Sequence, residues 1–157
     1  MLLYDVVDAF DKAKLKYVLI GGYALALHGV VRATIDVDFV LQLRMADYML
    51  AEKTLKEIGL TSRLPISATD VITMRKEYIK NRNLKAWSFV DNSAPSRQVD
   101  ILITHDMAKV SSQKMSVAGR RIAVATLEAL LKMKIQAGRP QDLIDVQSIR
   151  AKLDEKK

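Results

Sequence analysis

Two aspartates in the segment 35–41 form the first pattern in this sequence that points to chemistry. The segment reads Ile-Asp-Val-Asp-Phe-Val-Leu, which predicts a β-strand whose side chains alternate between two faces. Asp36 and Asp38 would share one face, with their Cα atoms roughly 7 Å apart. The apolar residues would pack on the other face: Ile35, Val37, Phe39 and Leu41. Like charges on one face repel, and a divalent cation bound by oxygen ligands relieves that repulsion. The alternative is a solvated strand face whose two acids bind nothing.

A third aspartate, Asp100, lies in the strand-like segment 98–103. Its apolar neighbours Val99, Ile101 and Ile103 alternate with it, so Asp100 is expected to point away from the core. If this strand lies beside the segment 35–41, three carboxylates converge on one face of a sheet. The sequence alone does not show that adjacency, and an isolated surface acid is the other interpretation.

The pair Gly21-Gly22 follows the apolar segment 17–20, which we expect to be a buried strand, and precedes a short helix over 23–28. Glycines let backbone N–H groups approach an anion closely, and a helix start favours negative charge. The plainer alternative is a glycine pair that serves only the geometry of the turn. For His28, at the end of this helix, we expect a packing or capping role rather than general-base chemistry.

Two helices near the C-terminus provide an independent signal. Thr126 is expected to cap a helix over 127–137 that stops at Gly138, and Pro140 suits the first turn of a helix over 140–153. Lys134 falls within the apolar stripe of the first helix, whereas Asp142 lies within the stripe of the second and Asp145 at its edge. The expected stripes consist of Leu127, Leu130 and Leu131, and of Leu143, Val146, Ile149 and Leu153. This arrangement indicates either a salt bridge between the helices or a phosphate-binding lysine held by acids.

The remaining elements are expected to form one domain over 1–157, of class α/β or α+β. Trp87 and Phe89 alternate on a strand and are expected to pack in the core, although stacking on a nucleobase is an alternative. The segment 71–74 suits either a strand or a helix. The other predicted elements are helices over 2–14 and 46–58, a strand over 85–90, a turn over 91–96 and a hairpin over 115–124.

The composition limits the classes of function. The chain has 157 residues and no cysteine, which excludes disulfides, thiolate zinc sites and cysteine nucleophiles. Its formal net charge of +7 favours anionic partners such as nucleotides. No apolar run approaches the roughly 18 residues of a membrane span, and the first ten residues lack a basic signal-peptide region. We therefore expect a soluble, cytoplasmic protein without membrane contact.

Taken together, these motifs resemble the signature of the polymerase-beta-like nucleotidyltransferase superfamily. The resemblance begins in the segment 21–29 and continues through Arg32, Thr34 and the segment 36–39. The His-Gly, Arg and Thr between the two halves resemble the AbiEii-like toxins, a branch of small nucleotidyltransferases. The segment 134–145 is similar to the C-terminal motif of that branch, a lysine and an arginine followed by two aspartates.

The resemblance implies a fold and a set of roles. The fold would be a mixed sheet flanked by helices, with two helices at the C-terminus. Many active members have serine where this chain has Gly22. By this resemblance, Gly21 and Gly22 would contact the triphosphate. The catalytic residues would be Asp36 and Asp38, which would bind Mg²⁺ or Mn²⁺, and Asp100, which would be a third catalytic and metal-binding carboxylate. Lys134 would contact the nucleotide, and Asp142 and Asp145 would complete the nucleotide pocket.

These roles describe a metal-dependent enzyme that moves a nucleoside monophosphate from a nucleoside triphosphate to an acceptor hydroxyl and releases pyrophosphate. The acceptor is open: a tRNA end, a protein hydroxyl or a small molecule. A second hypothesis is a toxin–antitoxin component or regulatory nucleotide-binding module, inactive without an antitoxin or another helical partner. A third is a glycosyltransferase that uses the Asp-x-Asp pair.

Overall fold

The computed structural model describes residues 1–156. In chain order the elements are α1 (Leu2–Lys12), β1 (Val18–Ile20), α2 (Gly21–Leu27), β2 (Val37–Val40), α3 (Met45–Glu57), β3 (Leu60–Ser62), α4 (Ala68–Thr73), α5 (Arg75–Arg82), β4 (Ala86–Asp91), β5 (Ala94–Leu102), η1 (Met107–Lys109), β6 (Ser112–Val117), β7 (Arg120–Ala125), α6 (Leu127–Ala137) and α7 (Pro140–Glu155).

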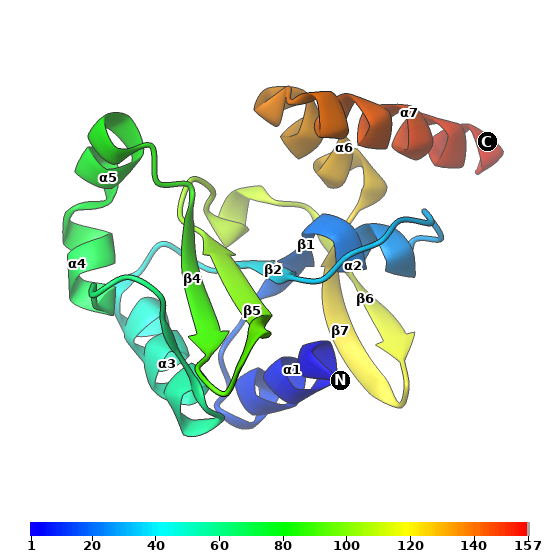
Figure 1. Cartoon of the computed structure of the whole chain (residues 1–157). Helices are drawn as coiled ribbons and strands as arrows, with labels where there is room; N and C mark the ends of the chain where they lie inside the picture. The colour runs from blue at the N-terminus through cyan, green and yellow to red at the C-terminus, as the bar shows by residue number, and fades with distance from the viewer. Residues whose placement is uncertain (157) are drawn as a thin grey trace.

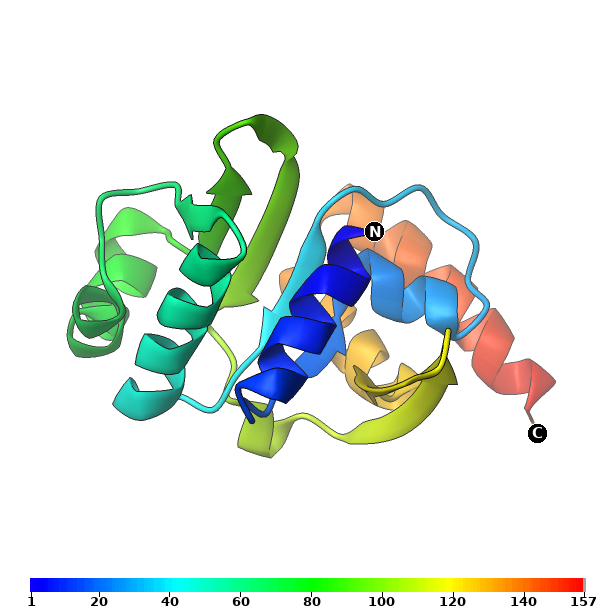
Figure 2. The ribbon, with the colours of Figure 1, turned by 90° about the horizontal axis from the view of Figure 1, so that it is seen from below.

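One mixed sheet organises these elements, with the strand order β3-β4-β5-β2-β1-β7-β6. The pairs β2–β5 and β1–β7 are parallel, and the others are antiparallel. Helices α1 and α3 lie on one side of the sheet, and α6 and α7 lie on the other (Figures 1 and 2). The predicted α/β class, with a mixed sheet and two C-terminal helices, is confirmed.

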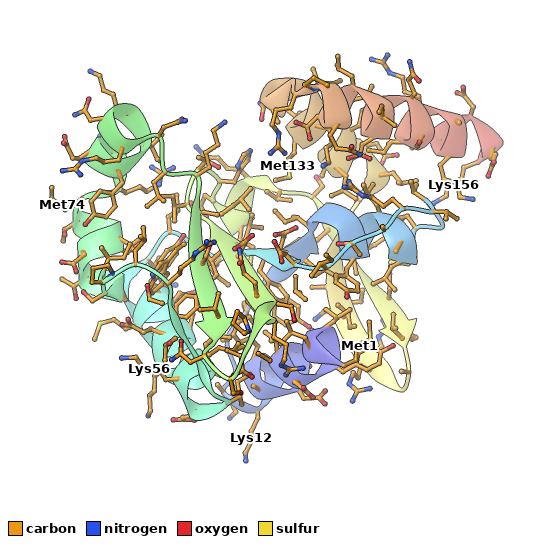
Figure 3. The ribbon with its side chains drawn as sticks, in the orientation of Figure 1. Met1, Lys12, Lys56, Met74, Met133 and Lys156 are labelled. Carbon is orange, nitrogen blue, oxygen red and sulfur yellow. The ribbon has the colours of Figure 1, made fainter. Side chains whose placement is uncertain are left out.

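Strand alternation separates a core face from a polar face in the middle of the sheet. On β2, Val37 and Phe39 are fully buried, and on β5 the same holds for Val99 and Ile101. Asp38 lies between the two buried residues of β2 and therefore points to the opposite face. Side chains of α1 and α3 gather against the sheet on the core side (Figure 3).

Aromatic residues fill the centre of the core. Phe10 of α1 packs edge-on against Phe39, with ring centroids 5.2 Å apart. Trp87 is 1% exposed and stacks on Tyr48 of α3 at 5.7 Å, and its Nε1 donates a hydrogen bond to the Ser62 hydroxyl. Phe89 is fully buried. The predicted core role of Trp87 and Phe89 is confirmed, since neither ring is free to stack on a nucleobase.

The strand predicted over 35–41 is shorter than expected at its start. It begins at Val37, Asp36 lies in a bend, and Ile35 is 71% exposed rather than packed. The reason is the end of the neighbouring strand. The antiparallel pairing ends with Ile20 opposite Asp38, and the chain then turns into α2, which leaves residues 35 and 36 without a partner on that side.

Two other expectations need correction. The segment 91–96 is not all turn, because β5 already begins at Ala94, and only Asn92 and Ser93 separate it from β4. The Asp91 side chain accepts hydrogen bonds from the Ser93 N–H and hydroxyl, which tightens this turn. Leu143 was expected in the apolar stripe of α7 but is 55% exposed.

The segment 60–82, which the sequence left undecided, is mostly helical. A capping box joins Ser67 and Asp70 at the start of α4. Val71 is fully buried in that helix, so the segment 71–74 belongs to a helix rather than a strand. Met74, labelled in Figure 3, joins α4 to α5. Within residues 1–156, no helix is both long and apolar enough to span a bilayer.

Candidate active site

Three aspartates meet where β2 and β5 run side by side. The two strands are parallel neighbours, and Asp38 lies directly opposite Asp100 in their register. Asp36 precedes β2 by one residue. The adjacency that the sequence left open is therefore present, because strand pairing places the two predicted acidic segments together.

Burial and the repulsion among the three aspartates raise the pKa values of Asp36 and Asp38. The pKa of Asp38 is raised to about 7, first by burial and then by the charges of Asp100 and Asp36. The positive charge of Lys134 acts in the opposite direction. The pKa of Asp36 is also raised, by burial and by Asp100, and Arg63 partly offsets this rise. A cation in this place would relieve the repulsion.

The donor set suits a hard divalent cation, since all candidate ligands are carboxylate oxygens. Gln98 donates a hydrogen bond of 2.9 Å to Asp100 Oδ1, which orients that carboxylate. Among the described residues, no group of three or more histidines, cysteines or acids is arranged so that it could hold a metal ion by itself. Magnesium typically takes only one or two protein carboxylates and completes its shell with water and substrate phosphates, so an open arrangement fits it.

Gly21 allows Asp38 to lie against the backbone of the β1–α2 junction. Its φ of +72° lies in the left-handed region that favours glycine. A Cβ atom at this position would collide with the Asp38 carboxylate, whose Cγ would be 2.9 Å away. Gly21 is therefore required both by the backbone conformation and by its contact with a predicted catalytic side chain.

Gly22 is explained by Thr34. A Cβ atom at position 22 would lie 2.6 Å from Thr34 Cβ and closer still to its hydroxyl. The segment that follows α2 thus packs directly against Gly22. In the same segment, the Thr34 hydroxyl donates a hydrogen bond to the Asp36 carbonyl at 3.4 Å. Glycine at position 22 is consequently a steric requirement of this chain.

The C-terminal helices bring Lys134 between two buried aspartates. Its Nζ lies 3.2 Å from Asp142 Oδ1 and 2.9 Å from Asp145 Oδ2. The Arg139 guanidinium bonds to Asp142 at 2.7 Å and holds the pKa of that carboxyl at about 2. The salt bridge between the helices is present, and α7 buries Asp142 and Asp145 while it exposes Leu143 and Ile144.

Sequence reasoning missed the role of Arg32. Its guanidinium pairs with Asp145 at 2.5 Å, a contact between residues 113 positions apart. The pair ties the segment that leads to Asp36 onto α7. The signal in the sequence was the place of Arg32 in the motif between the glycine pair and Asp36, which does not identify its partner.

His28 lies outside this cluster of charges. Its Nε2 donates a hydrogen bond of 2.7 Å to the Ala125 carbonyl, and the residue ends α2. The predicted packing and capping role is confirmed.

The lowered pKa of Asp142 should make the free energy of unfolding depend on pH. Because its pKa is lowered from 3.8 to about 2, its contribution is complete above about pH 4 and is lost as the pH falls through 2. We expect Asp142→Asn to lower the free energy of unfolding by about 1–3 kcal/mol at pH 7. The difference from wild type should shrink towards pH 2. Urea unfolding at pH 7, 4 and 2.5 measures this, with the exposed Glu128→Gln as control; a gap that is constant with pH contradicts it.

Comparison by sequence identifies no relative: no family model matches the chain, and no curated protein matches it significantly. Comparison of structures is informative. The antibiotic-resistance factor ANT(2″)-Ia, in a crystal structure with adenylyl-2″-tobramycin, superposes with a TM-score of 0.64 at 14% identity, over 97% of this chain and 87% of that chain.

Two further structures agree. The lincosamide antibiotic adenylyltransferase LnuA, bound to lincomycin, gives a TM-score of 0.61 at 13% identity, over 95% of this chain and 94% of that one. A protein from Thermotoga maritima, provisionally assigned as a nucleotidyltransferase, gives 0.61 at 18% identity, over 98% and 91%. At these identities the likeness concerns the fold, and this chain has the nucleotidyltransferase-type fold that its signature predicted.

Proposed function

We propose that this protein is a nucleotidyltransferase that moves a nucleoside monophosphate from a nucleoside triphosphate to an acceptor hydroxyl. The observation that carries the proposal is the apposition of Asp38 and Asp100 on parallel strands, with Asp38 lying against Gly21. Carboxylates, a glycine junction and the charge of Lys134, which acts on Asp38, are groups that phosphoryl chemistry uses, and they support this proposal.

The triphosphate side of the site is assigned to the glycines and the lysine. Gly21 and Gly22 have no side chain to keep phosphate oxygens from the backbone. Lys134 supplies a positive charge for the triphosphate and the departing pyrophosphate. Before a triphosphate binds, Asp142 and Asp145 form ion pairs with that lysine.

The acceptor side is assigned to the carboxylates. The acceptor oxygen attacks the α-phosphorus, and the bond from this phosphorus to the bridging oxygen of pyrophosphate breaks. The proton of the acceptor hydroxyl passes to Asp100, which Gln98 orients. Asp36, Asp38 and Asp100 would hold Mg²⁺ or Mn²⁺, which when bound offsets the charge that develops at the phosphorus and on the leaving group.

The structural neighbours support this reaction class. One of them holds adenylyl-2″-tobramycin, and another is a lincosamide antibiotic adenylyltransferase. This chain covers 94% of the LnuA chain, so its small size is no argument against enzymatic activity. The acceptor of this chain is not assigned by these likenesses.

The test is isothermal titration with each of the four nucleoside triphosphates in magnesium buffer. We expect at least one to bind, and we expect binding to be lost in an Asp36→Ala/Asp38→Ala variant, since the phosphates lose their metal ligands. A variant that binds as well as wild type would place the nucleotide elsewhere. No binding of any triphosphate by wild type contradicts the proposal and favours the second function.

That second function is a nucleotide-binding module that needs a partner chain, such as an antitoxin. One observation favours it: apolar side chains lie exposed around the first turn of α7 and before β2, with Ile35 71%, Leu143 55% and Ile144 59% exposed. Robust transfer by the isolated chain contradicts this alternative, whereas copurification of a stoichiometric helical partner that restores nucleotide binding supports it.

A further inference from the structure

Five charged side chains form a continuous network across three segments of the chain. In order of contact they are Arg32, Asp145, Lys134, Asp142 and Arg139. Arg32 comes from the segment before β2, Lys134 from α6, and both aspartates from α7. Helices α6 and α7, which carry Lys134 and both aspartates, lie together above the sheet in Figure 1.

The cations and carboxylates of this network are not paired one to one. Lys134 is shared between two carboxylates, at 2.9 Å from Asp145 and 3.2 Å from Asp142. Each carboxylate also has an arginine of its own, since Arg32 pairs with Asp145 at 2.5 Å and Arg139 pairs with Asp142 at 2.7 Å. The two arginines are therefore sufficient to compensate both acids, and the lysine is the cation in excess.

The pairing matters because both carboxylates are buried. The Asp142 side chain is 0% exposed and the Asp145 side chain 4%, so neither is compensated by water. A buried carboxylate that loses its only cationic partner is strongly destabilised. Lys134, whose side chain is 15% exposed, would be held firmly if it were the only partner of either acid.

We propose that Arg32 and Arg139 are positioning residues that keep Asp145 and Asp142 compensated, so that Lys134 is released at low cost to a triphosphate. The inference rests on the proposed function. Lys134 is near enough to Asp38 for its positive charge to act on that carboxylate, although the ion pairs of the lysine are with Asp142 and Asp145. In this proposal the two arginines act through the lysine, and the charge of Arg139 also interacts with Asp38.

Arg32 provides the sharper test because its side chain is 25% exposed, against 67% for Arg139. The probe is inorganic tripolyphosphate in magnesium buffer, which reports the phosphate side without base or acceptor, followed by the nucleoside triphosphate that binds best. We expect Arg32→Gln to weaken binding of both by about 10- to 100-fold, since Asp145 then depends on Lys134 alone. Arg32→Lys, which keeps the charge, should stay close to wild type.

The decisive variant is the double substitution Arg32→Gln/Asp145→Asn. With the carboxylate neutralised, Lys134 is no longer held there, and we expect binding to return to within about threefold of wild type. A merely structural role for the ion pair predicts the opposite, because the double variant also lacks the contact. Arg150→Gln on α7 is the control for the loss of a positive charge, since Arg150 is exposed and outside the network.

The outcomes separate this inference from the proposed function. If wild type binds both probes and Lys134→Met weakens binding, but Arg32→Gln does not, or the double variant is not rescued, the inference is wrong and the proposed function stands. If wild type binds neither probe, the proposed function fails and the inference with it. Thermal unfolding of each variant identifies any that do not fold. The variants Arg139→Gln and Arg139→Gln/Asp142→Asn then repeat the same comparison at Asp142.

Discussion

Asp38→Asn should abolish nucleotidyl transfer while the protein remains folded. Asp38 lies opposite Asp100 and against Gly21, at the centre of the carboxylate cluster. An amide at this position is a poor ligand for a divalent cation, because it lacks the negative charge that would hold the cation between Asp38 and the phosphates. We expect the transfer rate to fall about 10³-fold or more, because such charge stabilisation contributes several kcal/mol to the transition state. The measurement is magnesium-dependent transfer of labelled nucleotide to an acceptor on which wild type acts.

The same variant supplies its own control for folding. In metal-free buffer the pKa of Asp38 is raised from 3.8 to about 7, so ionisation of this group destabilises the folded state as the pH rises through that range. Asp38→Asn has no such ionisation, and at pH 8 in EDTA it should be more stable than wild type by on the order of 2–4 kcal/mol. Near pH 4 the two proteins should have nearly equal stability.

Thermal or urea unfolding in EDTA at pH 4, 6 and 8 provides this comparison. A variant that is both inactive and more stable at high pH assigns the loss to chemistry rather than to unfolding. Full transfer activity in Asp38→Asn would contradict the catalytic role of Asp38. An Asp38→Asn variant that is less stable than wild type at pH 8 would contradict the electrostatic description of the three aspartates.

Gly21→Ala is expected to have the second largest effect. The new Cβ would collide with the Asp38 carboxylate, and the φ of +72° at position 21 is unfavourable for alanine. Either the carboxylate or the β1–α2 junction must move. We expect a loss of transfer of about 100-fold or more, since displacements of about 1 Å in a reacting group have effects of this size. Stability should fall by about 1–3 kcal/mol from the backbone strain.

A matched control is present in the β6–β7 turn. Gly119 has a similar φ of +78°, but a Cβ there would meet nothing within 4 Å. Gly119→Ala should therefore show the loss of stability without the loss of transfer. Unfolding and transfer assays of both variants separate the two effects, and equal activity of Gly21→Ala and Gly119→Ala would show that Asp38 does not depend on this contact.

Local patterns in the sequence were enough to predict several parts of this protein. Alternation of polar and apolar residues predicted that Asp38 and Asp100 point away from the core, since the side-chain direction in a strand follows from its two-residue period. The same reasoning placed Trp87 and Phe89 in the core. Helical periodicity identified Lys134 as a lysine aimed at its neighbours and placed Asp142 and Asp145 near it, because both helices lie close together in the chain.

The tertiary structure decided which of these groups meet. The pairing of β2 with β5 puts Asp38 opposite Asp100, and strand pairing between distant segments depends on the whole sheet rather than on local sequence. Packing also exposes Leu143 and buries Asp145, against the ordinary preference of both residue types. The buried acid is compensated by Lys134 and by Arg32, and no local pattern contains the contact with Arg32, which lies 113 residues away.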